Sequence, residues 1–203
     1  MNSNSWRHTL TDLITPGAGI LFMKVGTHAQ ETLADIIKRK SQEIKETGYG
    51  LWGYGGNTCH PTSMVQPFAK GFEAAGKPIH LCMESMLSKH FAEPLCAAEF
   101  SLDGIKWEKI PDSIEVRGSR FALKIGEIFE KDFKLPLNRT RVPVGPNAGR
   151  LGSRYISGRV DKACLEVLAA PEIVNRDEPV AERQINLVAE LKAPYAVFLR
   201  NYR

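Results

Sequence analysis

The pattern of apolar residues changes character about halfway along the chain, and this change constrains the fold more than any other feature. The first half alternates continuous apolar runs with amphipathic stretches at helical spacing, which predicts strands alternating with helices. The second half alternates apolar and polar residues between glycine-containing turn pairs, which is typical of antiparallel hairpins. The sequence therefore predicts an α+β fold. We expect a largely antiparallel sheet, built from hairpins in the C-terminal two-thirds, with two or three helices packed on one side.

The clearest single element is a helix expected at about residues 28–47. Thr27 as its N-cap and Gln30 three residues later match a capping box, and Gly48 is a typical stop signal. Apolar residues share one face at helical spacing, and charges of alternating sign line the other face. We therefore expect this helix to bury one face and to expose the other to solvent.

The other elements follow from the same periodicities. A hairpin is predicted over Phe100–Trp107, because Asp103-Gly104 suits a two-residue turn that would place Leu102 opposite Ile105. The remaining expected elements are strands at 20–25 and 79–83, a short helix between Pro67 and Gly76, a hairpin over 114–125 with its turn at Gly118-Ser119, strands at about 133–144 and 155–168, a helix at 180–192 and a final strand at 195–200.

Composition excludes several classes of protein. Of the 203 residues, 25% are charged and 43% are apolar, which are values outside those of disordered, collagen-like and disulfide-scaffold chains. No apolar run approaches the roughly 20 residues of a membrane helix, and the first residues lack the charged and apolar regions of a signal peptide. We therefore expect one soluble, cytoplasmic domain over residues 1–203, with no membrane association and with homo-oligomerisation left open.

The cysteines are expected to be free thiols. Cys82 and Cys164 lie in apolar runs, where cysteine behaves as a small buried hydrophobic residue, whereas Cys59 lies beside His60 in a polar loop. The combination that we weigh as a zinc site consists of Cys59, His60, His80 and Cys82. The adjacent pair lacks the spacing that structural zinc sites favour. We therefore expect neither a metal nor another cofactor.

The segment from Gly48 to Thr62 is rich in glycine and aromatic residues. Its glycines match the spacing of a dinucleotide-binding loop, but that motif requires a strand before it and a helix directly after it, whereas a helix precedes it here. A Gly-rich turn leading into a strand explains the segment as well as a binding loop does. As a binding loop, it would stack on a ring and form hydrogen bonds through Trp52, Tyr54, Asn57, Thr58 and His60.

Residues 139–162 form the second unusual segment, which we call the basic segment. It holds six basic residues and one acidic residue, a local charge of +5 that exceeds the +4 of the whole chain. Arginine pairs well with phosphate and carboxylate oxygens, and glycines in a basic loop add backbone N–H groups that also favour anions. The alternative is a solvated loop that pairs with the acidic stretch 172–182. The expected anion-binding residues are Arg139, Arg141, Arg150, Arg154 and Arg159.

Catalytic motifs are weak in this chain. It contains none of the usual metalloprotease, serine-hydrolase or P-loop patterns, and His60-Pro61-Thr62 is a single H-x-T where a two-histidine phosphoesterase would require two copies. Cys59 and His60 are the candidates for catalysis. Sequence neighbours rarely form a nucleophile–base pair, because the base must be placed in space.

Three functions remain as predictions. The first is non-catalytic binding of an anionic, ring-bearing ligand such as a nucleotide, a cyclic nucleotide or a short oligonucleotide, for sensing or sequestration. The second is a nucleotide-directed hydrolase or transferase that uses His60 with Cys59 or with an unidentified carboxylate. The third is a protein-interaction subunit that docks an acidic partner through the basic segment.

Overall fold

The computed structural model of the chain describes residues 13–27, 31–55, 59–87, 96–117, 119–156, 160–172 and 181–202. In chain order the elements are β1 (Gly19–Thr27), α2 (Leu33–Thr47), β2 (Gly50–Tyr54), the π-helical turn η1 (Pro61–Val65), α3 (Gln66–Ala74), β3 (Ile79–Leu87), β4 (Ala97–Ser101), β5 (Glu108–Lys109), β6 (Phe121–Pro136), the 3₁₀ turn η2 (Leu137–Arg139), β7 (Thr140–Arg141), α4 (Gly152–Tyr155), β8 (Lys162–Val167) and β9 (Glu182–Tyr202). The predicted α+β class is confirmed, because the strands form one large, mostly antiparallel sheet with helices on one side.

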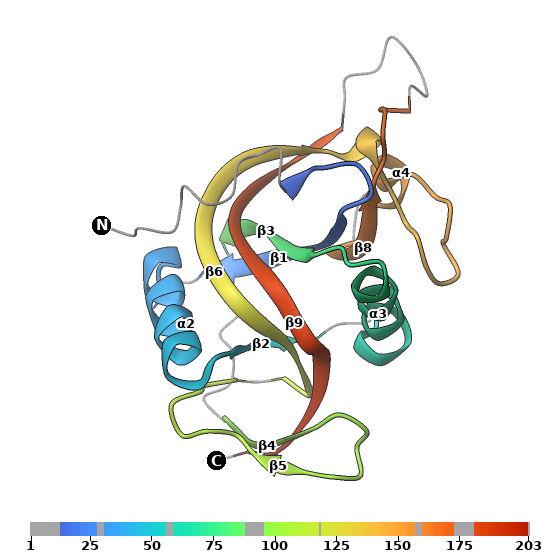
Figure 1. Ribbon diagram of the computed structural model, residues 1–203. Coiled ribbons are helices and arrows are strands. Elements are labelled where there is room, and N and C mark those ends of the chain that lie inside the picture. Colours follow the sequence, from blue (N-terminus) through green and yellow to red (C-terminus); the bar gives the residue numbers. More distant parts are fainter. Residues whose placement is uncertain are drawn as a thin grey trace.

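The sheet is organised around two long strands, β6 and β9, which curve side by side through the molecule (Figure 1). The strand order is β2-β6-β9-β3-β1-β8-β7, with β4 paired to β9 and β5 paired to β4. Only β1 and β3 pair in parallel among these strands, because α2, β2 and α3 carry the chain from the end of one to the start of the other. β8 pairs with the other edge of β1, where Leu21 lies opposite Cys164.

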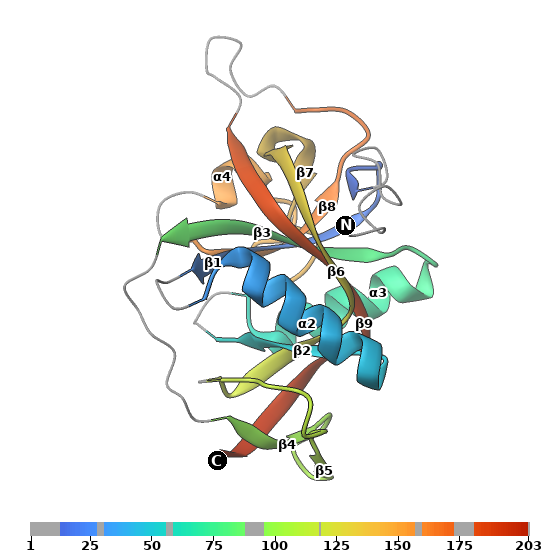
Figure 2. The same cartoon turned by 90° about the vertical axis from the view of Figure 1, so that its left-hand side faces the viewer.

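Helix α2 lies against β2 and β6 on one side of the sheet (Figure 2). Its N-cap is Thr32, whose hydroxyl accepts a hydrogen bond from Asp35 N at 3.2 Å, while the Asp35 carboxylate accepts one from Thr32 N at 3.0 Å. The predicted cap at Thr27 is therefore wrong, since Thr27 ends β1, and Gln30 lies outside the described residues. The predicted stop is confirmed, because Gly48 takes the left-handed conformation with φ 80°.

A buried ion pair fastens α2 to its neighbours. The ammonium group of Lys40 donates to both carboxylate oxygens of Glu43, at 2.9 and 2.8 Å, and to the carbonyl oxygens of Leu51 and Glu115, at 2.6 and 2.9 Å. The Glu43 carboxylate also accepts from the backbone N–H of Glu115. The pair therefore joins α2 to β2 and to the segment that precedes β6, and every partner is hydrogen-bonded.

Both faces of the sheet are buried. Successive residues of β1 point to opposite faces, and each set packs in an apolar cluster of its own. The face under α2 and α3 collects one apolar cluster, which includes Leu21, Met23, Tyr54, Cys59, Phe68 and Cys164. The opposite face collects a second cluster, which includes Ile20, Phe22, Cys82, Phe129, Tyr155 and Leu165. A smaller third cluster lies near β4 and includes Leu51, Ile110, Val116 and Val197.

The first half of the chain follows the predicted order of strands and helices. The strands expected at 20–25 and 79–83 are confirmed within β1 and β3, and the short helix is confirmed as α3. Strands expected at about 133–144 and 155–168 are confirmed in part. The first range holds the end of β6 and β7, separated by η2. The second range begins at the last residue of α4 and holds β8.

The helix predicted at 180–192 is wrong. Residues 182–192 belong to β9, a strand of 21 residues that also contains the correctly predicted final strand, and residue 180 lies outside the described residues. Five of the seven residues 185–191 are apolar, because Leu187 and Ala189 belong to one cluster while Ile185 and Val188 belong to the other. Such a run is buried on both faces and carries no period that separates a strand from a helix.

The hairpin predicted over 100–107 exists with a different turn. Phe100 of β4 pairs with Glu108 of β5 instead of Trp107, so a longer loop replaces the two-residue turn. The Asp103 carboxylate accepts the backbone N–H groups of Ile105 and Lys106, at 2.7 and 2.9 Å. These hydrogen bonds organise the loop in place of strand pairing and hold the Asp103 pKa below its usual value.

The hairpin predicted over 114–125 is wrong. Val116 does not face Phe121; its carbonyl accepts from Ala97 N, and the following residue, Arg117, bridges to Cys96. Residues 121–125 instead begin β6 and pair with both β2 and β9. Among the described residues, no helix is long and apolar enough to cross a membrane.

Candidate functional site

The two unusual segments of the sequence meet in the fold. Cys59, directly before η1, places its sulfur 3.2 Å from the sulfur of Cys164 on β8. The Lys162 ammonium lies 5.5 Å from the centre of the Tyr54 ring. Gly145 lies nearer the start of the basic segment. It is so close to Met64 of η1 that an added Cβ would stand 3.1 Å from the Met64 methyl carbon. α3 and α4 accordingly lie on the same side of the molecule in Figure 1.

Cys59 occupies a strained turn between a strand and a helix. It has φ 54°, and it is the only non-glycine residue with positive φ in the part of the chain that the structure describes. The Tyr54 hydroxyl donates a hydrogen bond of 2.7 Å to the Cys59 carbonyl and so ties the end of β2 to this turn. Pro61 follows at the start of η1, where its missing N–H costs no hydrogen bond. Such backbone strain is typical of functional sites.

The two thiols of this turn differ in acidity. A hydrogen bond from Cys164 lowers the pKa of the Cys59 thiol, and the Tyr54 hydroxyl and the charge of Lys162 lower it further against the opposing effect of burial. Burial raises the pKa of Cys164, and its hydrogen bond to Cys59 raises it further. Negative charge is therefore favoured on Cys59, with Cys164 as its donor.

Lys162 brings positive charge to this turn, and Arg150 brings positive charge to the neighbouring Tyr155. Lys162 is only 7% exposed, and its ammonium has one carboxylate near it, that of Asp161 at 3.2 Å. Burial raises the pKa of Tyr155, and the nearby charges of Cys59, Cys164 and Arg150 also act on its hydroxyl. We call Cys59, His60, Arg150, Tyr155 and Lys162 the Cys59 site.

His60 has a structural role in this site. Its Nδ1 accepts a hydrogen bond from Thr62 N at 3.3 Å and lies 3.0 Å from the Thr62 hydroxyl, so His60 caps the helix that begins at Pro61. Its exposed ring meets the ring of Phe121 edge to face, with 5.3 Å between the centroids. The H-x-T pattern of His60 and Thr62 is therefore explained by helix capping.

The structure places the predicted stacking rings in the core. Trp52 and Tyr54 are 7% and 0% exposed, and both belong to the cluster under α2 and α3. They share one face of β2, as the alternation predicts. Neither ring presents a face to solvent in this conformation, so the exposed ring of His60 and the half-buried ring of Phe121 are better placed to meet a ligand.

The predicted arginines have different surroundings. Arg141 pairs with Glu172, as the solvated-loop alternative expects for part of the segment, and the Nε atoms of Arg139 and Arg141 are buried without a hydrogen-bond partner. Arg150 and Arg154 are exposed, and Arg150 pairs with no acidic side chain among the described residues. The predicted contacts of Asn57, Thr58 and Arg159 lie outside the described residues.

The four residues weighed as a zinc site do not come together. Cys59 belongs to the cluster under α2 and α3, whereas Cys82 belongs to the cluster on the opposite face of the sheet. His80 lies on the same strand as Cys82 and two residues away, so it points to the same face. No group of three metal-ligating side chains occurs within the described ranges.

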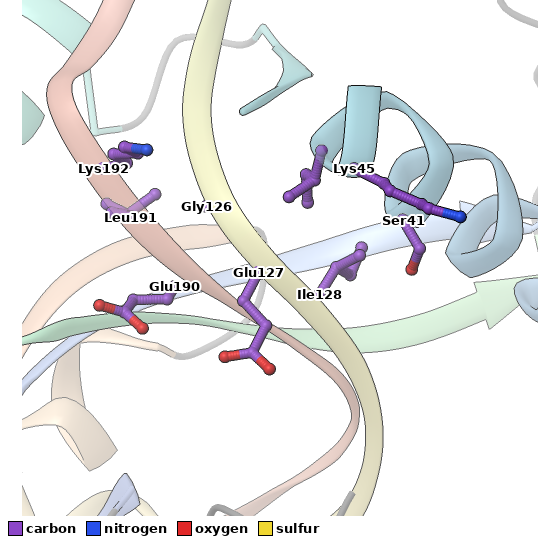
Figure 3. Close-up of a pocket in the computed structure, with 9 residues that line it drawn as sticks. Ser41, Lys45, Gly126, Glu127, Ile128, Glu190, Leu191 and Lys192 are labelled. Atoms are coloured by element: carbon purple, nitrogen blue, oxygen red, sulfur yellow. The ribbon is translucent and has the colours of Figure 1, made fainter. Parts of the chain in front are cut away.

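A pocket elsewhere was not foreseen from the sequence. It has a volume of about 650 Å³ and lies between α2 and the strands β6 and β9 (Figure 3). Its lining carries both signs of charge, through Lys45, Lys192, Glu127 and Glu190. Glu127 and Glu190 are direct neighbours across β6 and β9, a pairing that depends on the strand that we predicted as a helix. Its mixed charge makes it a poorer anion site than the Cys59 site.

In comparisons with known proteins, no family model, no curated protein and no solved structure matches the chain.

Proposed function

We propose that the protein binds an anionic small molecule at the Cys59 site, and that this ligand is nucleotide-like. The observation that carries the proposal is the charge balance of the site. Arg150 is exposed without an acidic partner among the described residues, and Lys162 is buried with a single carboxylate beside it. A guanidinium group without a carboxylate partner, and an ammonium group with only one, can still donate to phosphate oxygens.

Two exposed or half-buried rings support the ring-bearing part of the proposal. His60 and Phe121 lie together at the edge of the site, and Phe121 continues to Phe198 with 5.3 Å between the ring centroids. Base rings stack on such aromatic surfaces with little sequence preference. All four cysteines are free thiols, which supports work in a reducing compartment such as the cytoplasm.

One observation favours the enzymatic alternative. Cys59 combines positive φ, a position between a strand and a helix, and a thiol pKa that its neighbours lower. These are properties of activated nucleophiles. Against this stands its exposure of only 2%, and His60 uses Nδ1 to cap its own helix. We therefore place binding before turnover, and docking of an acidic protein after both, because Arg141 already has an acidic partner within the chain.

Isothermal titration with a panel of mononucleotides, cyclic nucleotides and short oligonucleotides tests the proposal. We expect at least one member to bind, with an affinity that falls as salt rises. Arg150→Ala should weaken binding by about 10- to 100-fold, since a hydrogen bond to a charged group contributes about 1.5–3 kcal/mol.

Lys109→Ala is the matched control. Lys109 is an exposed basic residue of β5 that pairs with Asp112, and β5 lies at the opposite end of the molecule from α4 in Figure 1. Its loss should leave the affinity unchanged. Binding by no member of the panel, or equal effects of the two substitutions, would reject the Cys59 site. Conversion of the ligand during the titration would favour the enzymatic alternative.

A further inference from the structure

We propose that Cys59 and Cys164 form a reversible oxidation site, which a peroxide converts to an intramolecular disulfide. This inference is independent of the ligand proposal, because it needs only the two sulfur atoms and their surroundings. The sulfurs lie 3.2 Å apart, and both cysteines are free thiols. A disulfide requires about 2.05 Å between the sulfurs, so the thiols need only a small approach to bond.

The surroundings distinguish this pair from an ordinary buried contact. Lys162 and the Tyr54 hydroxyl lie beside Cys59, and both favour a thiolate there over a thiol. The strained turn at Cys59 fixes the sulfur against β8. A thiolate with a second thiol in contact is the arrangement that peroxide-sensitive pairs require, with Cys59 as the attacking sulfur and Cys164 as the resolving one.

The chemistry balances with one peroxide. The Cys59 thiolate attacks a peroxide oxygen, the O–O bond breaks, and Cys59 becomes a sulfenic acid, while the leaving hydroxide takes up the proton that the Cys59 thiol had lost and becomes the first water. The Cys164 sulfur then attacks Cys59, its proton joins the departing hydroxyl group as water, and the disulfide forms. Two thiols are oxidised and one peroxide is reduced to two waters. Cys59 is 2% exposed and adjoins exposed His60, and a molecule as small as hydrogen peroxide needs only a local opening of the structure to reach it.

The cross-link would connect distant parts of the chain. The two cysteines are 105 positions apart in sequence, and the bond would join the turn before η1 to β8. Closing a loop of this length removes much of the freedom of the unfolded chain. We therefore expect the oxidised protein to melt on the order of 10 °C above the reduced one.

The test is a thiol map of the oxidised full-length protein. Reduced protein is treated with a small excess of hydrogen peroxide, quenched in acid, alkylated with N-ethylmaleimide under denaturing conditions and digested without reductant. Mass spectrometry should show the Cys59 peptide joined to the Cys164 peptide, with Cys82 alkylated. Dithiothreitol should restore alkylation of both residues and the lower melting temperature.

Two variants sharpen the result. Cys82→Ser should form the same cross-link, because Cys82 lies on the other face of the sheet. Cys164→Ser should stop at a sulfenic acid on Cys59 that dimedone traps. The proposal is overturned if wild-type Cys59 and Cys164 are both alkylated after the peroxide treatment. It is also overturned if Cys59 pairs with another cysteine or stops at a sulfinic acid while Cys164 stays free.

Discussion

Two lysines are buried among the residues that the structure describes, and their surroundings differ. Lys40 on α2 is 4% exposed and has hydrogen bonds to a carboxylate and to two backbone carbonyls. Lys162 on β8 is 7% exposed, yet its ammonium has one carboxylate at 3.2 Å and a tyrosine ring at 5.5 Å. A buried charge that its neighbours fully satisfy is part of the scaffold, whereas one with free donor capacity is suited to a ligand or a reactive group.

The same contrast separates two thiols. Cys82 lies in an apolar environment, and burial alone raises its pKa to about 12. Cys59 is buried nearly as deeply, but a donor thiol, a hydroxyl and a lysine lower its pKa. Burial by itself therefore makes a cysteine inert, and the polar neighbours make the difference at Cys59.

The largest effect is expected at the scaffold lysine. Lys40→Met should destabilise the protein by about 3–5 kcal/mol, because it removes the ammonium group that hydrogen-bonds both oxygens of the buried Glu43 carboxylate and leaves it with the more distant Arg39, at 3.6 Å. Urea denaturation measures the change. Lys38→Met, at an exposed position of the same helix, should stay within about 0.5 kcal/mol of the wild type.

A double variant tests the reason for that loss. Lys40→Met combined with Glu43→Leu removes both charges, so it should recover part of the stability that the single change costs. A single variant as stable as the Lys38→Met control would mean that the α2 ion pair adds nothing to the fold.

The next effect concerns stability at high pH. The Cys82 thiol keeps its proton in the folded protein up to about pH 12, whereas it loses the proton near pH 9 in the unfolded chain. Between these values the folded state binds more protons, so the free energy of unfolding falls as pH rises, by up to about 1.4 kcal/mol per pH unit for this group. Unfolding midpoints in urea at pH 8 to 11 measure the slope.

Cys82→Ala isolates the contribution of this thiol. It should reduce the slope between pH 9 and 11 by about 1 kcal/mol per pH unit, even though the loss of the sulfur costs some stability at every pH. Other groups with raised pKa, including Tyr195 at about 12, remain in both proteins and leave a residual slope. Identical slopes would show that the Cys82 pKa does not differ between the folded and unfolded states.

Local sequence signals predicted the first half of this fold better than the second. β1, α2 and β3 carry their own periodicity and caps, so their existence was predictable, and the error at the α2 cap arose because Thr27 and Thr32 each begin a capping pattern. β9 failed because partners on both faces, not a period in its own sequence, decide its structure. The turn at Asp103 failed because side-chain hydrogen bonds replaced a backbone turn.

The candidate site was predictable only as two separate segments. Glycine and aromatic density marked one segment, and charge marked the other, and the structure brings them together. No local pattern indicates that Cys59 meets Cys164, because that contact depends on β8 pairing with β1. It also could not show that Trp52 and Tyr54 face the core, since an alternating strand has two faces and only the packing of α2 and α3 selects one.

The smallest expected change in stability is at the site lysine, where the chemical effect is the informative one. Lys162→Met should alter the free energy of unfolding by less than about 1 kcal/mol, because its one carboxylate partner, Asp161, is half exposed and stays hydrated without it. Loss of the positive charge should raise the Cys59 pKa, so alkylation of Cys59 should need a higher pH and should slow below its midpoint. Peptide mass spectrometry of iodoacetamide-treated protein across a pH series gives this profile for Cys59, with Cys82 in the same samples as a thiol that the substitution should not affect. A profile for Cys59 that does not move, or a loss of stability as large as that of Lys40→Met, would remove the distinction between the two lysines and place Lys162 in the scaffold.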